Sequence, residues 1–254
     1  MFFNSRKWVL IRDSRHSAGF NMSKDARLLN QAIESLESPV LRFFDWRRPA
    51  ITIGYGQPRN DIDFEKIASE NIGFAVRPTG GRAVLHWNEL TYSVVIPKGN
   101  PINDLSVTES YRVISEALAG GLKKVGLDIE LSRGEIGGHR NPSCFSATSK
   151  FEITCNGRKL VGSAQRRKKG AILQQGSIPM DSNFRRLPEF FSDKSIGHDL
   201  VYKSTCVEEC LKSDIDKEQL IENIILAFSE IFMCEFSSFE EVLAGKATLK
   251  AEMP

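Results

Sequence analysis

Residues 141–181 read NPSCFSATSKFEITCNGRKLVGSAQRRKKGAILQQGSIPMD, and this stretch carries the strongest indication of the fold. Its centre is Asn156-Gly157, the type of dipeptide most typical of a two-residue β-hairpin turn. The flanking segments 151–155 and 159–165 have the character of strands, and segment 171–180 reads as a further strand. The stretch therefore predicts antiparallel strand pairing at the centre of the protein.

The same stretch contains a thiol and an amine that together suit acyl transfer. Cys144 stands fifteen residues before Lys159, which is followed by the small-residue turn Val161-Gly162-Ser163-Ala164. A thiolate can hold an acyl group as a thioester, and an ammonium can orient the carbonyl and favour the thiolate. Two simpler interpretations stay open: the cysteine as an inert buried thiol, and the lysine as a solvated charge on a strand edge.

Outward from this stretch, strands and helices are mixed and do not follow a regular β-α-β-α alternation. This order predicts an α+β fold with mixed or antiparallel sheets flanked by helices. Segments 40–46 and 50–53, which are split by the turn-like Arg47-Arg48-Pro49, are expected to form a hairpin or a strand pair. Further strands are expected at 8–11, 73–76, 90–96 and 127–131, and helices at 21–37, 64–72, 106–125, 217–232 and 239–250.

Composition narrows the class of protein. The 254 residues carry a net charge of +2, but segment 133–169 holds nine Lys and Arg against two Glu. That segment could attract an acidic partner, or it could be a solvated rim. The five cysteines are an odd number and the four histidines are scattered, so we expect neither a disulfide framework nor a metal site. We expect no signal peptide and no membrane span, and hence a cytoplasmic location.

The loop Arg77-Pro78-Thr79-Gly80-Gly81-Arg82 is a second candidate functional element. Its two glycines would let a ligand approach the backbone closely, and its two arginines are potential anion or carbonyl ligands. A plain turn is the simpler interpretation. His86 follows this loop, either as a satisfied structural residue or as a group that orients a substrate carbonyl or supports the nucleophile.

At these residues the chain resembles the biotin/lipoate protein ligase catalytic-domain superfamily, in its lipoate-ligase and octanoyltransferase branch. The resemblance covers roughly residues 5–185 and rests on segments 47–57, 77–96, 106–126 and 141–181. Cys144-Phe145 resembles the cysteine-dependent octanoyl-carrier-protein:protein octanoyltransferases. The Arg-Asn-Asp element usual in ATP-dependent ligases is missing before segment 151–155. Trp87 departs from the family, which tends to an acidic residue there, and so does the sequence of segment 21–27.

The resemblance implies a catalytic domain at residues 1–190 and a helical C-terminal extension at 191–254. It implies that an octanoyl or lipoyl group passes from acyl carrier protein to Cys144 as a thioester. The group then passes to a lysine of a lipoyl domain, in a 2-oxoacid dehydrogenase complex or the glycine-cleavage H protein. Lys159 would bind the carbonyl. The substrate-binding residues it implies are Arg77, Gly80, Gly81, Arg82, His86, Gly162, Ser163 and Ala164.

As a transferase the protein would need no cofactor, would bind neither nucleic acid nor membrane, and is expected to be a monomer. The main alternative is a lipoate-protein ligase that uses ATP and Mg²⁺ and forms a lipoyl-adenylate, with Cys144 incidental. A catalytically silent module that binds lipoyl domains and a generic cysteine hydrolase are further alternatives. The hydrolase would need a histidine base near Cys144, and sequence alone cannot place His86 or His139 there.

Overall fold

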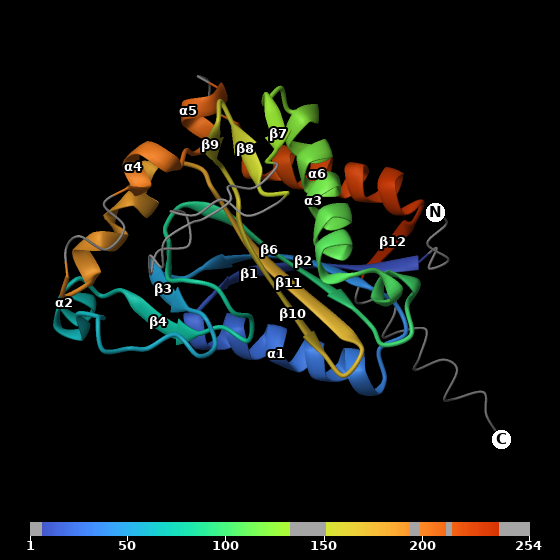
Figure 1. Cartoon of the computed structure of the whole chain (residues 1–254), viewed down its shortest axis with the longest axis horizontal. Coiled ribbons are helices and arrows are strands. Elements are labelled where there is room, and N and C mark those ends of the chain that lie inside the picture. Colours follow the sequence, from blue (N-terminus) through green and yellow to red (C-terminus); the bar gives the residue numbers. More distant parts are fainter. Residues whose placement is uncertain (1–6, 133–150, 194–198, 212–214, 239–254) are drawn as a thin grey trace.

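A six-stranded mixed sheet forms the centre of the molecule (Figure 1). The computed structural model describes residues 7–132, 151–193, 199–211 and 215–238. Neighbouring strands in the order β10-β11-β6-β2 are antiparallel, whereas β2, β1 and β12 are parallel. This mixed sheet confirms the expected α+β class. Its strands are β1 (Lys7–His16), β2 (Val40–Trp46), β6 (Glu89–Ile96), β10 (Gly162–Lys168), β11 (Ala171–Pro179) and β12 (Glu235–Ser238).

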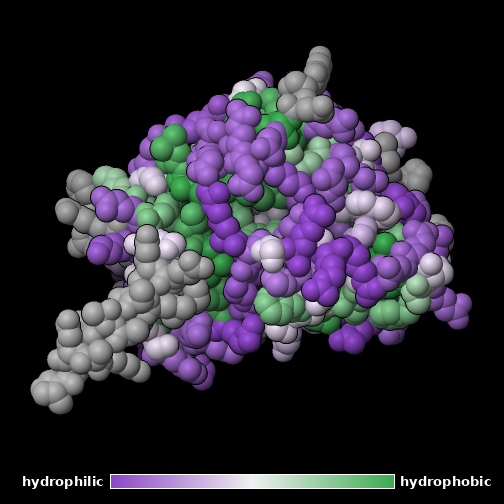
Figure 2. All heavy atoms as spheres, turned by 180° about the vertical axis from the view of Figure 1, so that it is seen from behind, coloured by the Kyte–Doolittle hydropathy of each residue, from purple (hydrophilic) through white to green (hydrophobic). Residues whose placement is uncertain are grey.

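Helices cover both faces of this sheet (Figure 1). Helix α1 (Ala18–Glu34) packs on one face, where its Leu28 and Leu29 share a buried cluster with Val40. Helices α3 (Val107–Lys124) and α6 (Lys217–Phe232) pack on the other face with Leu41. Because helices cover both faces, the central strands β2, β6 and β11 are buried along almost their whole length. Hydrophilic side chains cover most of the far side of the molecule (Figure 2).

Helix α3 begins and packs as its sequence suggests. Ser106 accepts a hydrogen bond from the Glu109 backbone N–H, and the Glu109 carboxylate accepts one from the Ser106 N–H, which completes a capping box. At Gly121 the helix meets α6 so closely that a Cβ would stand 2.5 Å from Ile224 Cα. The predicted helix at 106–125 is therefore confirmed, and a glycine permits its contact with α6.

Two three-stranded sheets flank the large one. The first contains β3 (Ala50–Ile53) between β4 (Gly73–Val76) and β5 (Val84–His86). The second contains β8 (Ile153–Cys155) between β7 (Ile129–Leu131) and β9 (Arg158–Lys159). The remaining elements are α2 (Phe64–Ser69), η1 (Pro101–Asp104), η3 (Ser182–Phe190), α4 (Leu200–Lys203) and α5 (Val207–Leu211).

The strand pairing differs from expectation at two places. Segments 40–46 and 50–53 form no hairpin, because β2 joins the large sheet while β3 joins a small one. The predicted strand at 159–165 is also divided. Its first part, β9, completes the Asn156-Gly157 hairpin with β8, and its second part, β10, crosses to the large sheet. Both turn residues have positive φ, 51° and 72°, as this hairpin requires.

The region after residue 190 packs onto the rest of the molecule. The predicted helix at 217–232 is confirmed as α6, whose Phe228 and Phe232 contact the buried Trp8 of β1. Strand β12 was not predicted and extends the large sheet beside β1. The division of the chain at residue 190 stays a prediction, and the predicted helix at 239–250 lies outside the described residues. No helix in the described part of the chain is long and apolar enough to cross a membrane.

Candidate active site

A cavity lies between the large sheet and the small sheet β4-β3-β5. Its apolar wall consists of Met22 from α1, Phe44 and Trp46 from β2, and Val84 from β5. Polar side chains and the small residues of two adjacent strands complete it. These are Thr52, Arg77, His86, Thr91, Gly162, Ser163, Ala164, Gln175, Gly176 and Ser177.

Most of the predicted substrate-binding residues meet at this cavity. Five of the eight line it: Arg77, His86, Gly162, Ser163 and Ala164. Gly80, Gly81 and Arg82 lie in the adjoining loop, outside the set of described residues that line the cavity. Since the β10 residues at the cavity have small side chains, the strand's backbone borders the space closely.

His86 is held rigidly in the cavity wall. Its Nδ1 lies 2.7 Å from Glu89 Oε1, and its Nε2 lies 2.7 Å from Thr52 Oγ1. The ring stacks on Trp46 with centroids 4.1 Å apart. Because both ring nitrogens have protein partners, His86 shapes the cavity, and this geometry favours the structural interpretation over a role as a base.

Glu89 is the buried anchor of this group and was not among the predicted site residues. Its carboxylate accepts hydrogen bonds from Trp46 Nε1, Thr91 and Ser177 as well as facing His86. Burial alone would raise the pKa of the Glu89 carboxyl, but the His86 charge and the hydrogen bonds from His86, Ser177 and Thr91 outweigh burial and lower it. The sequence did contain a sign of this pairing, because Glu89 stands three residues after His86, across the turn that joins β5 to β6.

The Arg77 side chain organises the glycine-rich loop. It is buried, and its guanidinium donates to the backbone carbonyls of Thr52 (3.0 Å), Gly80 (3.2 Å) and Arg82 (2.5 Å). Arg77 thus binds carbonyl groups of its own protein. The loop also packs directly on another turn, since a Cβ on Gly54 would stand 2.1 Å from the Gly81 carbonyl oxygen.

A chain of side-chain hydrogen bonds ties the same loop to the sheet and to α1. Thr79 Oγ1 donates to Gln175 Oε1 (2.7 Å), and Gln175 Nε2 donates to Asp25 Oδ2 (2.6 Å). All three residues are buried. The loop is therefore fixed to the wall of the site through Arg77 and Thr79.

Lys159 is a buried cation beside this site. Only 2% of the residue is exposed, and its Nζ lies 2.6 Å from Glu152 Oε1. Its backbone carbonyl accepts a hydrogen bond from the Thr205 N–H at 2.9 Å. Lys159 is thus not a solvated edge charge. It stands outside the described residues that line the cavity, but only Leu160 and Val161 separate it from Gly162.

Glu152 is a second residue of this region that was not among the predicted site residues. In the β8–β9 hairpin Thr154 pairs with Lys159. Glu152 stands two positions before Thr154, so its side chain lies on the same face as that of Thr154 and diagonally opposite Lys159. The Asn156-Gly157 turn fixes this register. The sequence therefore contained the signal that Glu152 and Lys159 face each other.

The backbone that presents Glu152 is held in an unusual conformation. Phe151 has φ 64°, a left-handed value that costs a bulky residue about 1–3 kcal/mol. Two backbone hydrogen bonds enforce it: Phe151 N–H donates to the Ser132 carbonyl (2.8 Å), and Ser132 N–H donates to the Glu152 carbonyl (2.9 Å). Glu152 is thereby fixed relative to β7.

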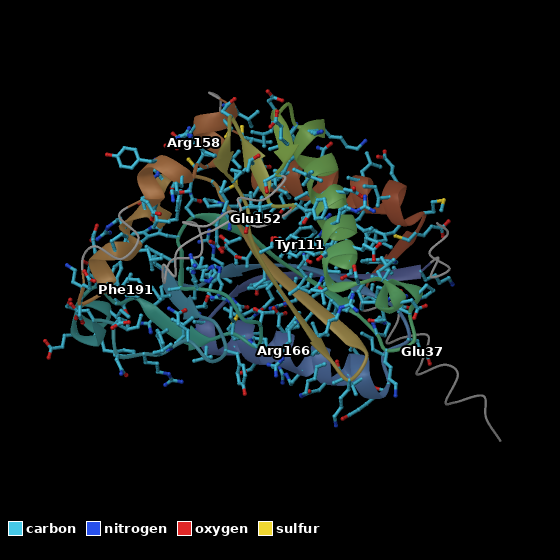
Figure 3. The ribbon with its side chains drawn as sticks, in the orientation of Figure 1. Glu37, Tyr111, Glu152, Arg158, Arg166 and Phe191 are labelled. Carbon is cyan, nitrogen blue, oxygen red and sulfur yellow. The ribbon has the colours of Figure 1, made fainter. Side chains whose placement is uncertain are left out.

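An apolar groove adjoins the cavity on the side of α3. Its lining includes Val107 of α3. It also includes Tyr111 of α3 and Glu152, both labelled in Figure 3. Ser163 and Ala164 line both the groove and the cavity. The two hollows therefore meet across the first residues of β10, next to the Lys159–Glu152 pair.

The predicted nucleophile Cys144 lies outside the described residues. Of the described cysteines, Cys155, Cys206 and Cys234 are buried, and burial raises the pKa of their thiols to about 12, 11 and 12. These three are thus poor nucleophiles. Among the described residues, no group of three His, Cys, Asp or Glu could hold a metal ion.

Comparison with known proteins agrees with this architecture. The chain is 36% identical to octanoyltransferase LipM from Bacillus anthracis, across 97% of this chain and 95% of that protein. It is 41% identical to octanoyltransferase LipM from Bacillus subtilis, across 72% and 69%.

A solved bi-partite lipoate protein ligase from Thermoplasma acidophilum has the same fold, with a TM-score of 0.71, 22% identity, and coverage of 94% of this chain and 91% of that one. The family model of the lipoyl protein ligase A/B catalytic domain matches residues 17–229. The chain therefore belongs to the lipoyl protein ligase A/B catalytic-domain family.

Proposed function

We propose that this protein is an octanoyltransferase of protein lipoylation, which moves an octanoyl group from a carrier thioester to a lysine of a lipoyl domain. The observation that carries this proposal is the 36% identity to octanoyltransferase LipM over nearly the whole of both chains. The cavity agrees with it, because an apolar wall suits a fatty acyl chain. Burying each methylene contributes about 0.8 kcal/mol.

The first step proposed is transthioesterification. The thiolate of Cys144 attacks the carbonyl carbon of the carrier thioester and forms a tetrahedral oxyanion. When this intermediate collapses, the carrier's sulfur leaves and takes up a proton, while the acyl group stays on Cys144. One thioester is exchanged for another, so the step needs no ATP. Acyl carrier protein is the donor we propose.

In the second step the amine of the acceptor lysine attacks the Cys144 thioester. The C–N bond forms, the C–S bond breaks, and a proton from the amine restores the thiol. An amide replaces a thioester, which pulls the reaction forward. The acceptors we propose are lipoyl domains of 2-oxoacid dehydrogenase complexes and the glycine-cleavage H protein.

Lys159 would stabilise the oxyanion in both steps. A buried ammonium is a strong hydrogen-bond donor to a developing negative charge, and loss of one such donor typically slows an enzyme about 10²–10³-fold. Support comes from its burial and from the two-residue connection to the cavity wall at Gly162. In the ligase alternative the same lysine would contact an adenylate, but the two octanoyltransferase LipM relatives favour the transferase.

Intact-mass spectrometry tests the proposal. The protein is mixed with octanoyl carrier protein, with and without ATP. We expect one added octanoyl mass, removable by hydroxylamine, that is independent of ATP and absent in Cys144→Ala. Cys210→Ala is the matched control and should acylate normally. Full transfer by Cys144→Ala, or an absolute requirement for ATP with release of pyrophosphate, would overturn the proposal.

A further inference from the structure

We propose that Glu152 is a positioning residue for Lys159, which holds the ammonium at the place where it can donate to the thioester carbonyl. This inference rests on the acyl-transfer function proposed above. Glu152 itself need not touch the substrate, since it would act through the lysine.

The first support is the ion pair itself. Lys159 Nζ lies 2.6 Å from Glu152 Oε1, and the two side chains are only 1% and 6% exposed. A buried charge needs a partner, because desolvation disfavours the charged form. A lysine side chain has several rotatable bonds, so a fixed carboxylate restricts the ammonium to few positions.

The second support is that both ends of the pair are anchored through the backbone. Glu152 follows the strained Phe151, whose N–H is bound to Ser132. The backbone carbonyl of Lys159 accepts a hydrogen bond from the N–H of Thr205, which lies in a segment distant in sequence. Such anchoring is what a pre-organised oxyanion donor requires, because small displacements of a catalytic group are costly.

The third support is location. Glu152 lines the apolar groove, and this groove shares Ser163 and Ala164 with the acyl cavity. The ion pair therefore stands beside the wall where the acyl carbonyl would emerge. The neighbouring Arg158 has a different partner, since its guanidinium lies 3.1 Å from the Glu209 carboxylate. Glu152 is the carboxylate that the structure shows paired with Lys159.

Single-turnover kinetics of the two half-reactions test this role. Glu152→Gln keeps the shape but removes the charge, so the ammonium should lose its fixed position. We expect acylation of Cys144 and transfer to a lipoyl domain each to slow about 10- to 100-fold, as a displacement of about 1 Å would predict. KM for the donor should change little, because the acyl cavity is untouched.

Three controls separate positioning from general damage. Glu116→Gln removes the carboxylate of a half-buried pair with Arg112 on α3 and should leave both rates unchanged. Glu152→Asp keeps the charge and should recover part of the lost rate. In a Lys159→Ala background, Glu152→Gln should cause no further loss, because the two residues act as one unit. Circular dichroism confirms folding of each variant at the assay temperature.

The outcomes discriminate clearly. Unchanged rates in a folded Glu152→Gln enzyme would overturn the inference, and so would a full additional loss in the Lys159→Ala background. Slowing of the transfer step alone would also overturn it, and would assign Glu152 to the acceptor amine. If Glu152→Gln does not fold, Glu152→Asp gives the same comparison of half-reactions. If the wild-type protein forms no acyl-enzyme, the proposed function fails instead.

Discussion

Glu89 shows how a single buried carboxylate organises the wall of the acyl cavity. It holds His86, which in turn holds Thr52, and it binds Trp46 through the indole N–H. Four elements of secondary structure depend on these contacts. A residue that never reaches the cavity can therefore determine the shape of the cavity.

We predict that Glu89→Gln destabilises the protein by about 1–3 kcal/mol at pH 7, the typical effect of weakening a charged buried hydrogen-bond group. The pKa of Glu89 is lowered in the folded protein, so its stabilisation is present above the ordinary pKa of 4.5 and is lost as pH falls through the lowered value. Urea unfolding at several pH values measures this. The gap between wild type and variant should shrink below pH 4.5, and a constant gap would contradict the prediction.

At the scale of elements, the α3–α6 interface depends on the absence of a side chain. A Cβ on Gly121 would stand 2.5 Å from Ile224 Cα, whereas a Cβ on Gly120 would stand 3.1 Å from Ala227 Cβ. Gly121→Ala should therefore destabilise the protein by about 1–3 kcal/mol, as overpacking usually does.

Gly120→Ala is the matched control, since it adds the same methyl group one position away. Its smaller crowding and the better helix propensity of alanine should nearly cancel. Thermal unfolding of both variants gives the comparison. Equal unfolding temperatures would show that the two helices can separate without cost.

The sequence predicted elements well where the signal was local. Asn156-Gly157 specified its hairpin, and the helix expected at 106–125 was found as α3. Prediction from the sequence failed where the strand partner that decides the pairing lies far away in the chain. Leu160 and Val161 look like ordinary strand residues, and only pairing of Gly162 with Ser177 reveals that the chain has changed sheets. Strand β12 likewise exists because the edge of β1 is available to it.

Residues of the candidate site were likewise predicted where a local motif marked them and missed where none did. The motifs predicted Arg77, His86 and the small residues of β10, which line one cavity, and also Gly80, Gly81 and Arg82, which are not among its lining residues. Glu89 and Glu152 were not assigned, because a lone acidic residue has no motif. For Glu152 the hairpin register would have supplied the missing step.

At the scale of the whole molecule, the region after residue 190 contributes to the core. Phe228 and Phe232 lie in the same buried cluster as Trp8, and β12 covers one edge of the large sheet. We predict that a chain truncated after residue 190 does not fold independently, because it loses a helix from one face of the sheet. Cooperative urea unfolding is the measurement. A cooperative transition in the truncated chain would instead support an autonomous domain at 1–190.

The two-residue link between β9 and β10 has an evolutionary consequence. Leu160 and Val161 are both buried, and they connect the strand of the cationic side chain to the strand of the cavity wall. Side chains alternate along an extended chain, so one inserted residue would turn the amine to the opposite side. Insertions and deletions should therefore accumulate elsewhere in the chain. The spacing Lys-x-x-Gly should be kept more strictly than the identity of the two residues between the lysine and the glycine.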